Sequence, residues 1–162
     1  MIDEFGENMK QLGWKIRKSD PLKITIEIPS GISKDELTKQ LREHQIECEY
    51  ADPDFLVFMV TPENTKEDLE RLLKTLGRNK FPYIKKEKKN LAKTTQVMSI
   101  REAMFTEPEN ILANLSSGRI CRVPTVSCPP AIPIAVPGEV IEEEMINLFA
   151  YYGIESIDVV KK

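Results

Sequence analysis

The sequence predicts an α+β fold: a two-layer β-α-β-β-α unit followed by a smaller α/β unit. Apolar and polar residues alternate over 22–28, which is typical of a half-buried strand. Leucines recur at 69, 72, 73 and 76, which is the spacing of one helical face. Between 78 and 93 the composition shifts to seven basic residues against one glutamate, which predicts a linker. We therefore divide the chain into domains 1–90 and 91–162.

The first unit is expected to open with a helix over residues 1–12. The strand at 22–28 follows and stops at a Pro-Ser-Gly turn. Ser33 is then placed to begin a second helix that runs to about His44. Glu36 lies three residues after Ser33, which is the spacing of a capping box.

The second half of this unit predicts two strands and a helix. Apolar residues alternate over 46–50, which indicates a strand, and Ala-Asp-Pro-Asp then forms a turn. The run 55–60, Phe-Leu-Val-Phe-Met-Val, is apolar without a break, which favours a strand buried on both faces. Asn64 or Thr65 is expected to cap the leucine-rich helix, and Gly77 to end it.

The second unit shows weaker patterns. Ser99 is expected to begin a short helix, and residues 110–115 are predicted to be helical as well. After a proline-rich segment, 141–152 carries apolar residues on one helical face and Gly153 ends it. Residues 154–160 read as a closing strand.

The composition excludes several classes of protein. The net charge of −3 and a pI near 5.4 argue against nucleic-acid binding by the whole chain, and the basic run 85–89 is expected to be a solvated linker. Three cysteines without a CxxC pair argue against a disulfide framework, and one histidine argues against a His-rich metal site. No apolar run reaches the ~18 residues of a membrane span, so we expect a soluble, cytoplasmic protein that binds neither nucleic acid nor membrane.

Few residues are candidates for chemistry. Cys128 has no activating cation nearby in the sequence, so we interpret it as a small packed side chain. The glutamates 142–144 point about 100° apart on a helix and cannot converge on one ion. Glu139 follows Pro137 and Gly138 directly, so a rigid turn would present its carboxylate to a cationic ligand. The alternative is that Glu139 caps the helix beginning near Ile141.

The segment 127–139, Ser-Cys-Pro-Pro-Ala-Ile-Pro-Ile-Ala-Val-Pro-Gly-Glu, resembles the C-terminal end of the bacterial Orn/Lys/Arg decarboxylases. That family typically carries Pro-Pro-Gly-Ile/Val-Pro, a few apolar residues and then Pro-Gly-Glu. Gly-Arg-Ile at 118–120 is similar to the family's approach to this loop. The resemblance implies a pyridoxal-phosphate enzyme of the aspartate aminotransferase fold. Domain 1–90 would then be its small domain and 91–162 its C-terminal domain.

The resemblance also implies roles for single residues. Glu139, Cys128 and Ala131 would contribute to substrate binding. The residues that would shape the loop are Pro129, Pro130, Pro133, Pro137 and Gly138. Ala131 stands where the family commonly has glycine, and Cys128 replaces a frequent tyrosine, so the choice among arginine, lysine and ornithine stays open.

The family's cofactor-binding motif is missing from this chain. Such enzymes hold pyridoxal phosphate on the lysine of a Ser-x-His-Lys stretch, whereas the one histidine here, His44, is followed by Gln45. We therefore expect the chain to bind no cofactor and to be inactive alone. The parent enzyme would hold pyridoxal phosphate in its large domain, which would be this chain's partner in a homo-oligomer.

A second interpretation explains the first unit equally well. A ferredoxin-like regulatory module that binds a ligand would use the β-α-β-β-α order and add the strand at 154–160 to the same sheet. It leaves the proline-rich loop unexplained, so we rank it second.

Overall fold

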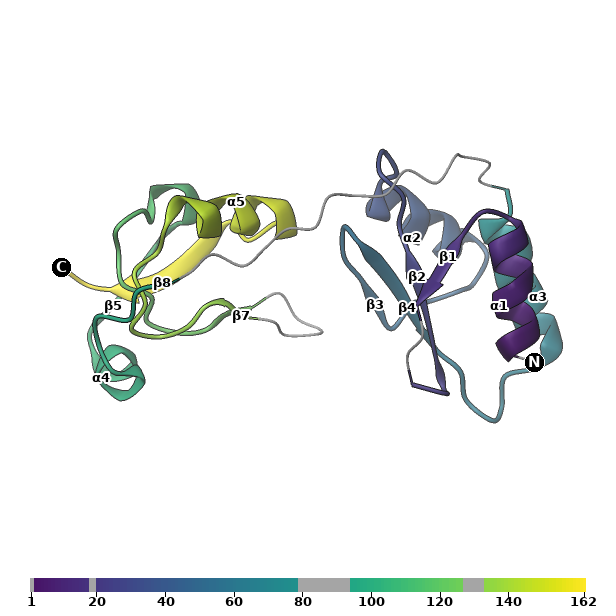
Figure 1. Ribbon diagram of the computed structural model, residues 1–162, viewed down its shortest axis with the longest axis horizontal. Helices are drawn as coiled ribbons and strands as arrows, with labels where there is room; N and C mark the ends of the chain where they lie inside the picture. The colour runs from purple at the N-terminus through teal and green to yellow at the C-terminus, as the bar shows by residue number, and fades with distance from the viewer. Residues whose placement is uncertain (1, 18–19, 79–93, 127–132) are drawn as a thin grey trace. The chain divides into compact units, whose positions relative to one another are not determined.

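The computed structural model describes residues 2–17, 20–78, 94–126 and 133–162. The chain forms two compact units, Met1–Glu87 and Lys88–Lys162 (Figure 1). The boundary between them falls within 79–93, so most of the predicted linker lies outside the described residues. Each unit is described by itself below.

The first unit is one antiparallel sheet with helices on one face (Figure 1). Its helices are α1 (Ile2–Gln11), α2 (Lys34–Glu43) and α3 (Lys66–Leu76). Its strands are β1 (Lys15–Arg17), β2 (Lys23–Glu27), β3 (Tyr50–Ala51) and β4 (Phe55–Met59). The strand order is β1-β2-β4-β3, and Ile26 of β2 lies opposite both Ile16 of β1 and Leu56 of β4.

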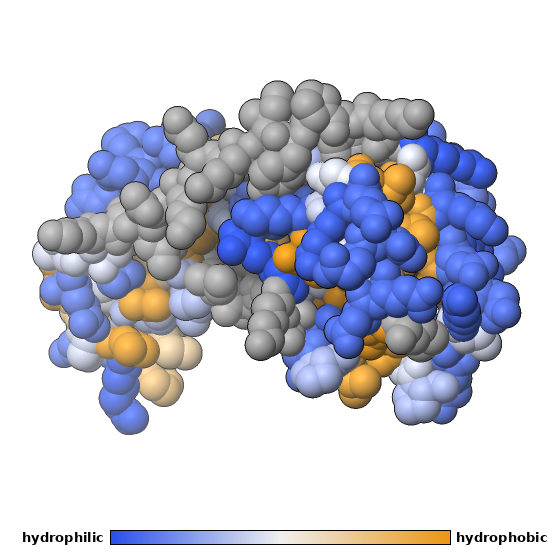
Figure 2. All heavy atoms as spheres, turned by 45° about the vertical axis from the view of Figure 1, so that its right-hand side comes forward, coloured by the Kyte–Doolittle hydropathy of each residue, from blue (hydrophilic) through white to orange (hydrophobic). Residues whose placement is uncertain are grey.

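The core of this unit lies between the sheet and its helices. Ile24, Ile26, Leu56 and Phe58 supply the sheet side. The helices and their flanks supply Phe5, Met9, Trp14, Leu37, Leu41, Leu69, Leu72 and Leu76. Among the coloured residues of Figure 2, hydrophilic ones cover most of the surface, with separate apolar patches between them. The amphipathic spacing of the three helices therefore accounts for the packing.

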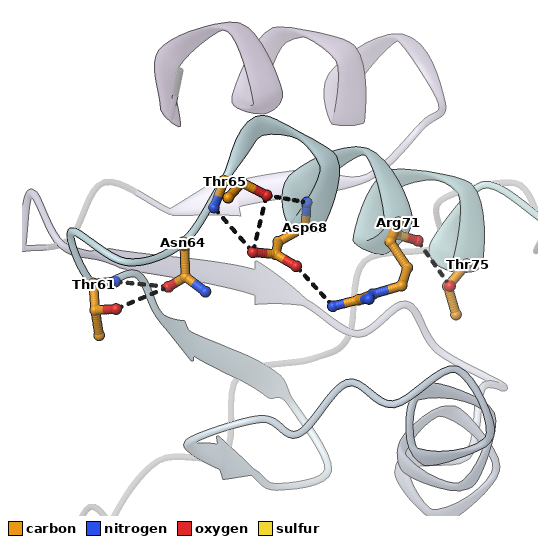
Figure 3. A network of polar contacts seen from close by, with 6 residues as sticks. All are labelled: Thr61, Asn64, Thr65, Asp68, Arg71 and Thr75. Atoms are coloured by element: carbon orange, nitrogen blue, oxygen red, sulfur yellow. Dashed lines mark hydrogen bonds and ion pairs between the residues drawn. The ribbon is translucent and has the colours of Figure 1, made fainter.

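The start of α3 is held by a network of side-chain bonds (Figure 3). The backbone N–H of Asp68 donates to the hydroxyl of Thr65, and the Asp68 carboxylate accepts from the backbone N–H of Thr65 at 2.9 Å. Arg71 donates to the same carboxylate at 2.8 Å. Thr65 is thus the predicted cap, while Asn64 accepts from the backbone N–H of Thr61 at 2.8 Å. Satisfying these free N–H groups fixes the first turn of the helix.

Two predictions for this unit need correction. β4 is not buried on both faces: Leu56 and Phe58 are buried, whereas Met59 is 49% exposed. The strand expected at 46–50 is instead the two-residue β3, Tyr50–Ala51. β1 is not predicted from the sequence, because three residues are too few to show an alternation of apolar and polar side chains. Gly77 ends α3 as predicted, with its backbone in the right-handed helical region.

The second unit is less regular. Its helices are α4 (Ile100–Phe105), the 3₁₀ turn η1 (Ala113–Leu115) and α5 (Glu143–Tyr152). Its strands are β5 (Pro108–Leu112), β6 (Thr125–Val126), β7 (Pro133–Ala135) and β8 (Ser156–Val160). β5 pairs with β8, and β6 pairs with β7, both antiparallel. The core contains Cys121, Ile134, Ile141, Met145, Leu148, Phe149, Ile157 and Val159.

The helix predicted at 110–115 is wrong. Residues 108–112 form β5, and only the 3₁₀ turn η1 follows. Exposure alternates along β5, and the Asn110 side-chain amide donates to Asp158 of β8 at 2.7 Å. Pairing with a strand almost fifty residues away overrides the weak local preference.

The position of the closing strand argues against the ferredoxin-like interpretation. β8 pairs with β5 of its own unit and adds nothing to the sheet of the first unit. The ferredoxin-like arrangement therefore loses the strand it required. Within the described ranges, no helix has the length and hydropathy of a membrane span.

Candidate functional site

Gly-Arg-Ile at 118–120 and the Pro-Gly-Glu end of the second segment that carries the family resemblance lie side by side in the second unit. The N–H of Cys121 donates to the C=O of Glu139 at 2.8 Å, and the N–H of Gly138 donates back to the C=O of Cys121 at 2.9 Å. The pairing continues with the N–H of Ile141, which donates to the C=O of Arg119 at 2.9 Å. Residues 118–121 and 138–141 therefore run antiparallel, although about twenty residues separate them.

Each of these segments has a second neighbour. On one side, the N–H of Val160 in β8 donates to the C=O of Ile120 at 2.9 Å. On the other, the N–H of Val97 donates to the C=O of Gly138 at 2.9 Å, and that of Val140 donates to the C=O of Thr95 at 3.0 Å. A continuous set of backbone bonds thus connects β5, β8, 119–122, 138–141 and 95–98. The Pro-Gly-Glu turn is held inside this layer.

Gly138 is the residue that allows the layer to close. Its φ is +91°, in the region that favours glycine. A Cβ built at this position would lie 2.1 Å from the backbone oxygen of Met98. Glycine is therefore required twice here, by the backbone conformation and by the close approach of residues 97–98.

Glu139 is anchored at both carboxylate oxygens. Oε1 accepts from the hydroxyl of Thr94, and Oε2 accepts from the backbone N–H of Val136 at 2.9 Å. The side chain is half-buried. The helix-cap alternative is wrong, because α5 begins at Glu143 with Glu142 at its N-cap. Each oxygen keeps lone-pair capacity, so the arrangement can accept a further donor such as an ammonium or guanidinium group.

Two arginines hold the segment before this turn. Arg119, whose side chain is 13% exposed, donates to the carboxylate of Glu109 on β5 and to the C=O of Val160 at 3.0 Å. Arg122 donates to the C=O of Met104 at 2.9 Å and of Thr106 at 3.0 Å. The second arginine satisfies free carbonyls at the end of α4. These roles, like that of Thr94, were missed because their partners are distant in sequence.

Cys121 pairs with the turn through its backbone, and its thiol is expected to be unreactive. It is fully buried, and its thiol donates to the C=O of Val123 at 2.9 Å. Burial, with a further contribution from the negative charge of Glu139, raises the pKa of the Cys121 thiol to about 12. The thiolate is the reactive form, so Cys121 packs rather than reacts.

The other predicted residues divide into two groups. Cys128, Ala131, Pro129 and Pro130 lie outside the described residues. Pro137 is buried behind the turn, whereas Pro133 is exposed at the start of β7. Their predicted contribution to substrate binding or loop shape stays a prediction.

His44 and Cys48 have structural roles in the first unit. His44 is the C-cap of α2, where its Nδ1 lies 2.8 Å from the C=O of Gln40. Cys48 is half-buried against the core, although outside any strand, and burial raises the pKa of its thiol. Neither residue belongs to the candidate site.

The described residues do not form a binding site for pyridoxal phosphate. None of the lysines within 2–17, 20–78, 94–126 and 133–162 is buried, whereas a Schiff-base lysine is held in a desolvated pocket. The same part of the chain contains no cluster of three or more side chains able to hold a metal ion. What the candidate site offers is one anchored carboxylate on a rigid turn.

Comparison with known proteins gives a consistent set of relatives. No protein-family model matches the chain. An arginine decarboxylase of Bacillus subtilis is 32% identical over 139 residues, which cover 79% of this chain and 28% of that protein. One of Halalkalibacterium halodurans is 31% identical over 133 residues, covering 76% and 27%. The chain thus spans less than a third of the length of these relatives.

Solved structures share the fold. The constitutive lysine decarboxylase of E. coli aligns with a TM-score of 0.60 at 18% identity, covering 88% of this chain and 32% of that chain. Lysine decarboxylase A of Pseudomonas aeruginosa aligns with a TM-score of 0.62 at 17% identity, covering 88% and 30%. At these identities the similarity concerns the fold.

Proposed function

Because the chain belongs to the bacterial Orn/Lys/Arg decarboxylase family and corresponds to part of such a protein, we propose that it shapes the substrate end of a decarboxylase acting on a basic amino acid. The observation that carries this proposal is the backbone pairing of Gly-Arg-Ile with Pro-Gly-Glu, which places the anchored carboxylate of Glu139 on a rigid turn. Arginine is the favoured substrate, since the sequence relatives are named arginine decarboxylases.

In this proposal the two units have different places in the enzyme. Residues 1–90 form the small domain of an aminotransferase-type fold, and 91–162 form the C-terminal domain. The remaining part of the enzyme supplies pyridoxal phosphate and the lysine that holds it, because the described residues lack a suitable site. The assembled enzyme is a cytoplasmic homo-oligomer.

The role of Glu139 follows from charge and rigidity. The side chain of a basic amino acid loses hydration when it enters an enclosed site, and a carboxylate offsets that loss with a charge-assisted hydrogen bond of about 1.5–3 kcal/mol. The bonds from Thr94 and Val136 orient the carboxylate before the substrate arrives. Little side-chain entropy is then lost on binding.

The first test separates the chain from the intact enzyme. The isolated chain should show no cofactor absorption band and should release no CO₂ from arginine, lysine or ornithine. The intact decarboxylase should release CO₂, fastest from arginine. A reducible cofactor adduct on any lysine of the isolated chain would overturn the proposal.

The second test concerns the carboxylate itself. In the intact decarboxylase, Glu139→Gln removes the charge and should raise KM and lower kcat/KM about 10–100-fold, at about 1.4 kcal/mol per decade. Glu142→Gln is the matched control, since Glu142 makes no side-chain cap bond at α5. Steady-state kinetics and a melting curve should be recorded for both variants. A lower Tm with unchanged kinetics for Glu139→Gln would reduce this residue to a structural role.

A further inference from the structure

The carboxylate of Glu139 is held in place by neutral groups. Its Oε1 accepts from the hydroxyl of Thr94, and its Oε2 accepts from the backbone N–H of Val136 at 2.9 Å. Among the described residues no lysine or arginine forms an ion pair with it, whereas Arg119 pairs with Glu109 in the same unit. The negative charge of Glu139 is therefore oriented by these two donors and remains available to a cation from outside the described residues.

The bonding capacity left on the two oxygens suits a guanidinium group. An ionised carboxylate has about four lone-pair positions, shared equally between its oxygens. Thr94 and Val136 occupy one position on each oxygen of Glu139, so each oxygen keeps one. A guanidinium is planar and donates two parallel N–H groups to both oxygens at once, whereas an ammonium group is a point charge without this fork. The carboxylate therefore matches the end of an arginine side chain better than that of lysine or ornithine.

The position of Thr94 depends on the folded layer and not on the turn itself. The segment 94–98, which we name the strap, runs beside the Pro-Gly-Glu turn. The N–H of Val97 donates to the C=O of Gly138 at 2.9 Å, and a Cβ at residue 138 would collide with the backbone of the strap. This close approach brings the hydroxyl of Thr94 to the carboxylate of Glu139, which is 45 residues later in the chain.

Resting on the proposed function, we propose that Thr94 is a positioning residue that determines specificity. Its hydroxyl turns the Glu139 carboxylate so that both oxygens face the two N–H groups of a guanidinium. Without that bond the carboxylate can rotate about its side-chain torsions and present a single oxygen. An ammonium group accepts such a change, because it needs no fixed pair of oxygens. The bond from Thr94 therefore favours arginine over lysine and ornithine.

The competing explanation is that the bond from Thr94 only ties the strap to the turn. Its loss would then lower the stability of the second unit and would affect every substrate alike. The two explanations differ in the ratio of kcat/KM for arginine to kcat/KM for lysine, which a purely structural bond does not change.

The proposal is tested by kinetics in the intact decarboxylase. Thr94→Val keeps the shape of the side chain and removes the hydroxyl. It should lower kcat/KM for arginine about 5–10-fold, mainly through KM, and kcat/KM for lysine less than about twofold. Thr94→Ser retains the hydroxyl and should restore the preference for arginine. Thr95→Val is the control, because Thr95 is the exposed neighbour and its hydroxyl has no bond among the described residues.

A double variant shows whether Thr94 acts through Glu139. Glu139→Gln replaces one oxygen by an amide nitrogen and cannot accept both N–H groups of the fork. Adding Thr94→Val to Glu139→Gln should therefore change kcat/KM for arginine by less than about twofold. Independent losses that multiply in the double variant would contradict the positioning role.

The wild-type enzyme offers a test that needs no variant. Butylguanidine and butylamine carry the two cations on the same apolar chain, and each can compete with arginine. Butylguanidine should inhibit at a concentration about 5–10-fold lower than butylamine, because only the guanidinium makes the paired bonds. Equal inhibition by the two compounds overturns the proposal even if Thr94→Val fails to fold.

The outcomes separate this proposal from the proposed function. Unchanged kinetics in Glu139→Gln overturn the substrate-binding role of Glu139, and the role of Thr94 with it. A loss in Glu139→Gln, together with an unchanged ratio of arginine to lysine in Thr94→Val, overturns the role of Thr94 alone. A lower Tm for Thr94→Val with that ratio unchanged assigns the bond a structural role. A wild-type enzyme that prefers lysine contradicts the match to a guanidinium but leaves the decarboxylase function standing.

Discussion

Each of the two units is stabilised internally in a different way. In the first, β2 and β4 pair in register over five positions, and three amphipathic helices pack their apolar faces on one side of the sheet. In the second, the middle of the layer contains no strand of its own: isolated bridges at Gln96, Ile120 and Cys121 join loops to one another and to β8. Regular strand pairing forms the sheet of the first unit, whereas irregular pairing between loops holds the Pro-Gly-Glu turn of the second. The candidate site lies in the irregular unit.

This comparison predicts that apolar burial dominates the first unit. Leu56→Ala removes a fully buried side chain from β4 and should lower the free energy of unfolding by about 2–5 kcal/mol. Val57→Ala changes the next residue on the same strand, which points to the face of the sheet away from the helices, and in the isolated chain should cost less than about 1 kcal/mol. Urea unfolding followed by Trp14 fluorescence measures both, since Trp14 is the chain's one tryptophan and lies in this core. Similar losses at 56 and 57 would contradict the one-sided core.

The second unit should depend instead on single backbone positions. Gly138→Ala adds a Cβ next to the Met98 oxygen at a φ of +91°, and should destabilise this unit by about 2–3 kcal/mol. Gly118→Ala is the control: its φ is +70°, but a Cβ there meets nothing within 4 Å, so only the conformational cost of about 1–2 kcal/mol remains. Amide hydrogen exchange at Cys121 and Ile141 reports the loss. If both variants exchange alike, the close approach to Met98 does not matter.

How far the sequence predicts each unit follows from the same difference. The sequence predicts helix ends at Ser33, at Asn64 or Thr65, and at Gly153, because capping depends on a few neighbouring residues, and the structure has them at Ser33, Thr65 and Gly153. β5 was mistaken for a helix because its strand state comes from β8, far along the chain. Helix caps and turns can be predicted from neighbouring residues in a sequence, whereas strand pairing between distant segments cannot.

The candidate site shows the same limit. Glu139 was identified from its position after Pro137 and Gly138, since the turn is local. Its anchor Thr94 lies forty-five residues earlier, and no motif connects the two. The sequence places Gly138 in the turn but does not predict that glycine is required there, because the approach of Met98 depends on the folded layer. A sequence can therefore indicate a candidate residue but not the distant residues that hold its side chain.

The smallest expected effect concerns two capping boxes, one in each unit. Hydrogen bonds from Thr65, its backbone N–H first, lower the pKa of Asp68 at the start of α3, and bonds from Ser99, its hydroxyl first, lower the pKa of Glu102 at the start of α4. A lowered carboxyl pKa means that the folded state favours the ionised form. The contribution of each cap is therefore complete above the unfolded pKa, near pH 4, and is lost as pH falls through the folded pKa.

The two helices should respond differently to that loss. α3 buries Leu69, Leu72 and Leu76 in the core and should remain folded when its cap is protonated. α4 has six residues and buries only Ala103, so nothing but its ends resists fraying. Amide chemical shifts recorded from pH 6 to about pH 3 should therefore show fraying at α4 and little change beyond the first turn of α3. Glu102→Ala, which removes the acceptor for the backbone N–H of Ser99, should show the frayed α4 already at pH 6, whereas Asp68→Ala should leave the body of α3 intact. Equal fraying of both helices would mean that packing does not distinguish the two units at their helix ends.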